Sequence, residues 1–281
     1  MTRQGRFVDD PPFVDEPFLA KSNPVHLDKG CGMILTDIFR HPVKSLGSES
    51  LQRVRLLPDA ALPGDRHYAI THGKSEFAKG PLGWVRCKNF LRIANVPQLA
   101  AYKITFEPER QHLWVTDATD CTKFDLADSK GRQDLVSLVM NAPSAHVLQP
   151  FSIVDIPGVS LSDSPHQAVS LGFRSTLRAL EVASGLALDP RRFRMNLWID
   201  GGKPWTEVSL VGREFRVGDI WFEGIERITR CLVPAASPVS GIRDTNPLKT
   251  LSSSFGRKDF GILARVLSAG DLAIGAAAVL D

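Results

Sequence analysis

Glycine and proline interrupt the chain from one end to the other. There are 22 glycines and 19 prolines among the 281 residues, and they are spread along the sequence. Glycine weakens regular elements through its backbone freedom, and proline ends them because it lacks an amide donor. The chain is therefore expected to form many short elements joined by turns. This pattern favours a mostly β protein with a few short helices, of the α+β class.

Composition limits the kind of partner that the chain can have. Hydrophobic residues make up 43% of the sequence, enough for a real core, and the net charge is only +3. This small net charge does not predict a protein that binds along nucleic acid, although it leaves room for a local basic pocket. Residues 1–30 are broken by Asp, Pro and Lys and predict a loosely held extension without a signal peptide. No apolar run reaches 18 residues, so we expect a cytoplasmic protein without a membrane anchor.

The four cysteines, Cys31, Cys87, Cys121 and Cys231, are far apart in sequence. No C-x-x-C pair is present, so zinc ribbons, iron–sulfur clusters and thioredoxin-like chemistry have no support. Reduced thiols are expected.

Several segments carry clear patterns of secondary structure. Helical spacing over 131–142, 174–185 and 246–256 predicts three helices, the last with Asn246 as its N-cap and Gly256 as its stop. Strands are predicted for 33–41, 66–71, 101–107 and 111–117, with the last two forming a hairpin.

The segment RRFRMNLWID (191–200) is predicted to be a strand with two unlike faces. Period-two alternation places Phe193, Met195, Leu197 and Ile199 on one face. Arg192, Arg194, Asn196 and Trp198 then share the other face. That polar face is either a solvated outer surface, or Arg194 and Asn196 together bind an anion or a polar ring.

The segment IERITRCLV (225–233) holds Cys231 near the end of another predicted strand. Thr229 and Cys231 would share one face, Arg230 would point to the opposite one, and Pro234 would stop further pairing. A strand end that opens onto a loop is a common place for site chemistry. A lone cysteine is, however, most often a small buried hydrophobic residue.

Two turns supply further candidate anion ligands. HPVKSLGSESL (41–51) places Lys44 and Ser45 in a Gly/Ser-rich turn with free backbone N–H groups. PGDRHYAI (63–70) brings Arg66 out of a tight turn into a strand. Taken singly, each is typical of an ordinary surface turn.

Together and in this order, these segments resemble the MOSC family, the molybdenum cofactor sulfurase C-terminal domain proteins. The matching pieces include HPVKSL, GDRHYAI, RFRMNLWIDG and ITRCLVPAASPVSG. The resemblance is to two-part members, such as the mitochondrial amidoxime-reducing component and its bacterial relatives. It implies a β-barrel MOSC core over 126–281, a β-barrel-like N-terminal region over 31–125, and a bound molybdenum–molybdopterin cofactor.

The resemblance also implies a role for individual residues. Cys231 would ligate molybdenum and would be the catalytic cysteine, because a soft metal prefers a thiolate. A hydroxyl near a helix start is expected too, and both Ser170 and Ser175 fit. The residues implied to contact the cofactor are Lys44, Ser45, Arg66, Ser170, Ser175, Arg194, Asn196 and Thr229.

The preferred function is an oxidoreductase that reduces N-hydroxylated compounds such as amidoximes and hydroxylamines. The chain carries no ferredoxin-type cysteines, so electrons are expected from a separate ferredoxin, flavoprotein or cytochrome. His41 stands where relatives commonly have an aromatic residue, and it is a candidate proton donor.

Two other functions are open. The first is a sulfur carrier or cofactor-delivery protein that uses Cys231 as a persulfide or a transient ligand. The second is a non-catalytic interaction module. Pyridoxal phosphate is not expected, since no domain for it is visible.

Overall fold

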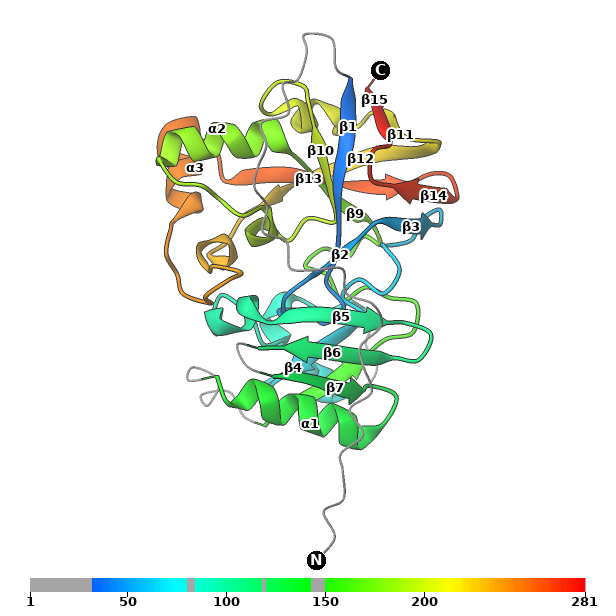
Figure 1. Cartoon of the computed structure of the whole chain (residues 1–281), viewed down its shortest axis with the longest axis vertical. Coiled ribbons are helices and arrows are strands. Elements are labelled where there is room, and N and C mark those ends of the chain that lie inside the picture. Colours follow the sequence, from blue (N-terminus) through cyan, green and yellow to red (C-terminus); the bar gives the residue numbers. More distant parts are fainter. Residues whose placement is uncertain (1–31, 80–83, 118–119, 143–149, 281) are drawn as a thin grey trace, which may run out of the picture. The chain divides into compact units, whose positions relative to one another are not determined.

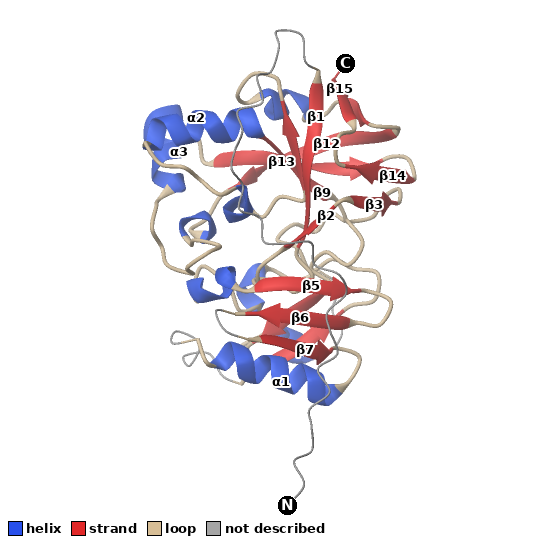
Figure 2. Ribbon diagram, in the orientation of Figure 1, coloured by secondary structure: helices blue, strands red, loops and turns tan. Residues whose placement is uncertain are grey.

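The computed structural model describes residues 32–79, 84–117, 120–142 and 150–280. The predicted extension over 1–30 and Cys31 lie outside these residues. Three α-helices occur in the described ranges: α1 (Ser129–Met140), α2 (Arg174–Ser184) and α3 (Pro247–Phe255). The strands are β1 (Met33–Arg40), β2 (Glu49–Leu51), β3 (Arg53–Leu56), β4 (Tyr68–Thr71), β5 (Lys103–Glu107), β6 (His112–Thr116), β7 (Cys121–Asp125), β8 (Ser152–Asp155), β9 (Val169–Phe173), β10 (Leu197–Asp200), β11 (Glu214–Val217), β12 (Ile220–Thr229), β13 (Asp259–Val266), β14 (Gly270–Ala273) and β15 (Ala277–Leu280). The mostly β class with a few helices is confirmed (Figure 2).

The largest sheet closes into a barrel. Its strand order is β10-β9-β13-β12-β11-β15-β1-β2, and a further pairing of β10 with β1 joins the two sides (Figure 1). Closure leaves no free edge among the seven strands of the ring. β9 and β10 run parallel and are connected through α2, as parallel neighbours require.

The barrel interior is filled by apolar side chains from most of its strands. Leu35, Leu171, Ile199, Phe222 and Ile262 are among its fully buried members. Their alternation with outward residues follows the period of two that a half-buried strand imposes. Around this core, Lys44 and Cys231 follow β1 and β12, whereas Arg194 and Asn196 precede β10.

A second group of elements carries a separate core. β5, β6 and β7 form an antiparallel sheet, β4 pairs with β8, and α1 packs against β7 and β8. Asp128 caps α1 by accepting hydrogen bonds from the backbone N–H groups of Lys130 and Gly131. The buried residues of this core include Tyr68, Leu99, Phe106 and Leu135.

Most predicted elements are present. The hairpin of β5 and β6 forms as predicted, and α3 begins after Asn246, which accepts a hydrogen bond from Lys249 N, and ends at Gly256 in the left-handed region. The predicted domain boundary between 125 and 126 stays a prediction.

The predicted strand over 191–200 is wrong in its first half. Asp189 caps a 3-10 turn, η5 (Pro190–Phe193), by accepting a hydrogen bond from Arg191 N, and Arg194 ends that turn with φ of 53°. Only residues 197–200 form the strand β10. The two predicted faces therefore do not exist, and Trp198 is fully buried against Phe193. An Asp-Pro start favours a helical turn over an extended strand.

Candidate active site

The turn after β1 carries the first predicted ligand pair. Ser45 adopts φ of 73°, and the turn is fixed by Lys44 N donating to Tyr68 O at 2.7 Å. The Lys44 side chain is buried, and its Nζ donates to Leu161 O at 2.7 Å and pairs with Asp163 at 2.5 Å. Burial lowers the pKa of Lys44, and the Asp163 carboxylate opposes that shift. Lys44 is thus a positioned cation that already has an anionic partner.

Arg66 joins this turn to two others. Its backbone, with φ of 49°, receives a hydrogen bond from Leu161 N and donates one to His41 O. Its guanidinium pairs with Asp65 and donates through Nη2 to Arg194 O at 2.8 Å. Arg66 therefore holds the η5 turn beside the Lys44 turn.

Arg194 has one donor nitrogen without an acceptor among the described residues. Nη1 donates to Leu46 O at 2.6 Å, whereas the buried Nη2 has no hydrogen-bond partner in that part of the chain. Burial and the neighbouring Arg66 charge lower the pKa of Arg194 to about 9, so it remains cationic at neutral pH. A buried donor without a partner is costly, so an acceptor such as a water molecule or a bound anion would stabilise Nη2.

Asn196 and Ser170 form hydrogen bonds mainly with each other. Asn196 Oδ1 accepts hydrogen bonds from Ser170 N at 3.0 Å and Ser170 Oγ at 2.9 Å, and Asn196 Nδ2 donates to Phe39 O at 3.2 Å. Both residues are buried. Their side chains fix the strands that flank Arg194, and the predicted cofactor contacts of both residues stay predictions.

Ser175 lies in a different place. It begins α2, and its Oγ donates to Gly201 O and Lys203 O. It lines a groove of about 660 Å³ together with Arg178, Val182, Ser254 and other residues of α2 and α3. In the described ranges, this groove shares no lining residue with the Lys44–Arg66–Arg194 cluster.

Cys231 is an exposed free thiol just beyond the barrel. β12 ends at Thr229, which is exposed and pairs with Asp259, so the predicted strand over 225–233 stops two residues before the cysteine. The reading of Cys231 as a buried apolar residue is thereby excluded. The strand end predicted at Cys231 therefore lies at Thr229.

Arg230 is anchored to two other segments, while the neighbouring Cys231 is exposed. Its guanidinium donates to Phe193 O at 2.8 Å and through two nitrogens to Phe260 O at 2.9 and 2.6 Å. Burial lowers the pKa of Arg230 to about 10, while the adjacent Cys231 sulfur favours its charge. Arg230 therefore fixes the end of β12 to the turn that precedes Arg194.

Asp163 was not found from the sequence. Its side chain is 70% exposed, yet it lies among cations. Desolvation by the surrounding protein opposes its ionisation, but Lys44, Arg66 and Arg194 together lower the pKa of Asp163. The DSP stretch gives no local signal for this position, because the contacts come from three separate turns.

His41 does not suit the proton-donor role that the sequence suggested. Its side chain is fully buried, and Nδ1 lies 3.3 Å from Asp65 Oδ1. Burial, with the Arg194 and Arg66 charges, lowers the pKa of His41 to about 3. The ring is therefore neutral at pH 7 and enclosed by protein, where it orients Asp65 towards Arg66.

The cluster as a whole is positive. Four cations (Lys44, Arg66, Arg194 and Arg230) face two carboxylates (Asp65 and Asp163), which leaves a charge of +2 from four minus two. The cluster would suit a ligand with an anionic group at one end, which the surplus charge and Arg194 Nη2 would bind. At its other end the ligand would carry a soft metal, which the exposed thiol of Cys231 would bind. A phosphorylated molybdopterin has those properties.

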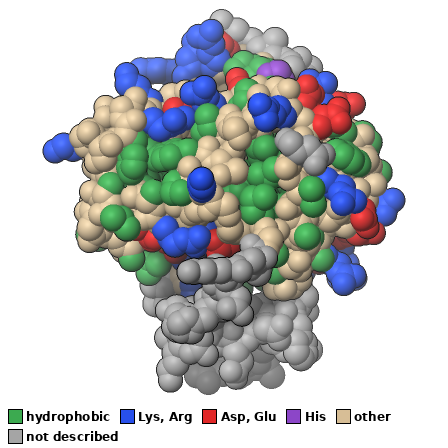
Figure 3. All heavy atoms as spheres, turned by 90° about the horizontal axis from the view of Figure 1, so that it is seen from above, with side chains coloured by type: hydrophobic (Ala, Val, Ile, Leu, Met, Phe, Trp, Pro, Cys, Tyr) green, Lys and Arg blue, Asp and Glu red, His purple; other side chains and the backbone are tan. Residues whose placement is uncertain are grey.

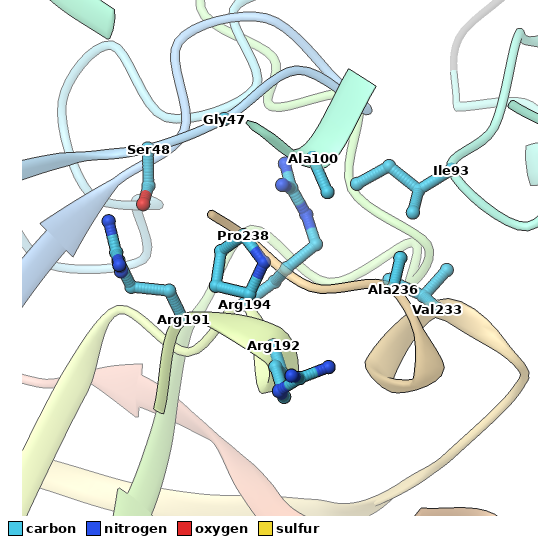
Figure 4. Close-up of a pocket in the computed structure, with 10 residues that line it drawn as sticks. All are labelled: Gly47, Ser48, Ile93, Ala100, Arg191, Arg192, Arg194, Val233, Ala236 and Pro238. Atoms are coloured by element: carbon cyan, nitrogen blue, oxygen red, sulfur yellow. The ribbon is translucent and has the colours of Figure 1, made fainter. Parts of the chain in front are cut away.

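A small cavity lies on the inner side of Arg194 (Figure 4). Its volume is about 10 Å³, room for one water molecule, and its walls include Ser48, Arg192, Ala236 and Pro238. It is too small to hold a pterin.

The described ranges contain no helix that is long and apolar enough to cross a membrane. They also contain no group of three or more His, Cys, Asp or Glu residues that could hold a metal ion.

Comparison with known proteins identifies the class. The MOSC domain matches residues 159–279, and the MOSC N-terminal beta barrel domain matches residues 33–147. These matches span most of the sequence, and the chain belongs to the MOSC family as a two-part member.

Among solved structures, the YUAD protein from Bacillus subtilis is similar at 10% identity, covering 89% of this chain and 97% of that one, with a TM-score of 0.44. YiiM from Geobacillus stearothermophilus is similar at 20% identity over 40% of this chain and 53% of its own, with a TM-score of 0.31. No curated protein matches the sequence.

Proposed function

We propose that this chain is a molybdenum-cofactor-dependent oxidoreductase that reduces N-hydroxylated compounds. The observation that carries the proposal is the convergence of Cys231 with a basic cluster that has a free buried donor at Arg194. Membership of the MOSC family supports the cofactor class, and the choice of an N–O substrate rests on the sequence resemblance to amidoxime-reducing proteins.

The residues divide into two working groups. Lys44, Arg66 and Arg194 would hold the phosphate of the cofactor, because their charges come from three turns that hydrogen bonds fix. Cys231 would supply the thiolate ligand. When bound, the metal centre supplies two-electron oxygen-transfer chemistry.

Arg230 and Asn196 would hold the segments of the site in position. Arg230 fixes the end of β12 through two backbone carbonyls, and Asn196 fixes the strand that follows Arg194. Such supporting contacts keep a site within the tolerance that catalysis needs.

The first experiment measures metal, pterin and turnover together. Protein purified from a molybdenum-sufficient host should carry molybdenum in stoichiometric amount. It should also reduce benzamidoxime or hydroxylamine with reduced methyl viologen as the electron donor. Loaded protein that turns over no N–O substrate would contradict the reductase function.

A second candidate is favoured by one specific observation. Cys231 is exposed, which a persulfide-carrying cysteine must be. In this function the protein carries sulfur or delivers the cofactor, and Cys231 is a persulfide or a transient ligand. Mass spectrometry that finds a persulfide on Cys231 in metal-free protein would favour this candidate over the reductase.

A further inference from the structure

The segment that follows Cys231 exposes large apolar side chains that the proposed chemistry does not use. Leu232 is 49% exposed, Val239 is 74% exposed and Ile242 is 64% exposed. Apolar exposure alone is common, and the face in Figure 3 shows several hydrophobic areas among charged residues. A docking surface therefore needs further support from order, charge and position.

The segment is held in place from its inner side. Ala236 and Pro238 line the small cavity beside Arg194 (Figure 4). Ser237 N donates to Ile242 O at 2.8 Å, and Gly241 N donates to Ser237 O at 2.9 Å. The exposure of Val239 and Ile242 is thus a property of a built loop.

Gly241 shows how closely the loop approaches its neighbour. It has φ of 68°, and a Cβ there would lie 2.7 Å from Gln98 Cα. Arg243 Nη2 donates to Ala94 O at 2.6 Å on the same side. The loop tip is therefore fixed to the 94–98 segment, with its apolar side chains turned outward.

The charges near the loop are unevenly balanced. Arg243 and Lys258 are exposed, and neither has an ion pair in the part of the chain that the structure describes. The two nearby carboxylates are already neutralised, Asp244 by Arg192 and Asp259 by Arg257. Lys258 also adjoins the site, since its carbonyl accepts a hydrogen bond from Arg230 N at 2.8 Å.

We propose that Leu232, Val239, Ile242, Arg243 and Lys258 form the docking surface for an acidic electron-carrier protein. This inference rests on the proposed function and names the partner of the same site. The surplus positive charge selects an acidic carrier and speeds its encounter. A few apolar residues suit a small, transient redox interface.

Position favours a redox protein over a membrane. Leu232 follows Cys231 in the chain and Lys258 is hydrogen-bonded to Arg230 N, so this end of the docking surface adjoins Cys231 and a carrier bound over it would bring its redox group towards the metal site. A lipid surface would cover the thiol and supply no electrons. In each turnover the N–O bond of R–NHOH breaks, two electrons come from the reduced carrier, two protons come from solvent, and R–NH₂ and water are formed. The carrier is oxidised in the same turnover: two molecules of a one-electron haem or iron–sulfur carrier each give up one electron, or one molecule of a fully reduced flavin carrier gives up both.

The experiment compares two electron donors on the loaded full-length protein. Reduced methyl viologen needs no docking, whereas reduced plant-type ferredoxin, flavodoxin and soluble cytochrome b5 are acidic carriers. The double variants are Val239→Asp with Ile242→Asp, and Arg243→Glu with Lys258→Glu. Matched controls are Val182→Asp on α2 and Arg53→Glu on β3, both exposed and outside the proposed surface.

Both double variants should raise the KM for at least one acidic carrier about tenfold and leave viologen-driven turnover within about twofold of wild type. The controls should change neither rate. The charge-reversed variant should also lose the decrease in carrier-driven rate that added salt causes in wild type.

Other outcomes overturn the inference. Viologen turnover that none of the three carriers supports would contradict the docking surface, as would equal losses with both donors or equal effects in the controls. Binding of anionic phospholipid vesicles that the double variants abolish, without any effect on carrier KM, would assign the surface to a membrane. A loaded protein without viologen turnover would instead contradict the proposed function.

Discussion

The turns that carry the basic cluster differ sharply from the loop that follows Cys231. Lys44, Arg66 and Arg194 are tied down by hydrogen bonds to backbone carbonyls of other segments. Leu232, Val239 and Ile242 turn their side chains to solvent. Restrained cations suit a ligand that stays bound, and an open apolar rim suits a partner that comes and goes. Cys231 lies where these two regions meet.

The largest effect is expected from replacing Cys231, where the two regions meet. Cys231→Ala should lower molybdenum content and turnover about a hundredfold or more, because it removes the proposed metal ligand. Metal analysis and viologen-driven turnover measure this. The free energy of unfolding should change by less than about 0.5 kcal/mol, since the side chain is exposed. Full metal content in the variant would show that Cys231 is not a ligand.

The second test asks whether Arg230 stabilises the turns that carry the basic cluster. Arg230→Met should reduce the free energy of unfolding by about 2–4 kcal/mol, because it leaves the carbonyls of Phe193 and Phe260 without their charged donor. Urea denaturation measures this. Arg227→Met, three residues earlier on the same strand and exposed, should cost less than about 0.5 kcal/mol. Equal losses of stability in the two variants would show that the hydrogen bonds of Arg230 do not stabilise the fold.

A smaller effect is expected at Asp163. This carboxylate holds Lys44 and competes with any bound anion. Asp163→Asn should therefore tighten phosphate binding to cofactor-free protein about five- to tenfold, as measured by calorimetry. Glu226→Gln is the matched control, because Glu226 accepts a hydrogen bond from Ser164 of the same loop but pairs with no cation of the cluster. Unchanged or weaker phosphate binding in Asp163→Asn would be the opposing result.

The last test concerns pH, where two opposing contributions leave a small net change in wild-type stability. The pKa of His41 is about 3 in the folded protein, below its usual 6.5, so the folded state takes up no proton where the unfolded state does. The contribution of His41 to the free energy of unfolding therefore falls as the pH drops from 6.5 towards 3, by about 1.4 kcal/mol per pH unit. Burial raises the pKa of Glu207 to about 7, so its contribution instead falls as the pH rises from 4.5 to 7.

These two slopes oppose each other between pH 4.5 and 6.5. Wild-type stability should be nearly flat there, while His41→Gln should lose stability with rising pH and Glu207→Gln should gain it. Urea denaturation at five pH values separates the three curves. Parallel curves for wild type and both variants would contradict the assigned protonation states.

Local rules predicted much of this fold, and their failures have physical causes. Asn246, Pro247 and Gly256 act within one helix, so the bounds of α3 could be predicted from sequence. The left-handed turn at Arg194 could not be predicted, because its conformation depends on hydrogen bonds to Leu46 and from Arg66. The alternation pattern predicted a strand across η5, although Asp189 and Pro190 are a local signal for the start of that turn.

The candidate site shows the same division. Cys231, Lys44 and Arg66 could be named because each lies in a short recognisable motif. Asp163 and Arg230 could not, since their significance comes from distant partners such as Lys44 and Phe260. Side chains defined by long-range contacts are the part of a site that a single sequence conceals.

The position of β1 has a consequence for how the molecule is assembled. This strand is synthesised first among the described elements, yet it closes the barrel by pairing with β10 and β15, both near the other end of the chain. The ring therefore stays open during translation until its last members have emerged. A fragment restricted to residues 159–279 would lack β1 and would leave the edges of β10 and β15 that pair with it open to other strands.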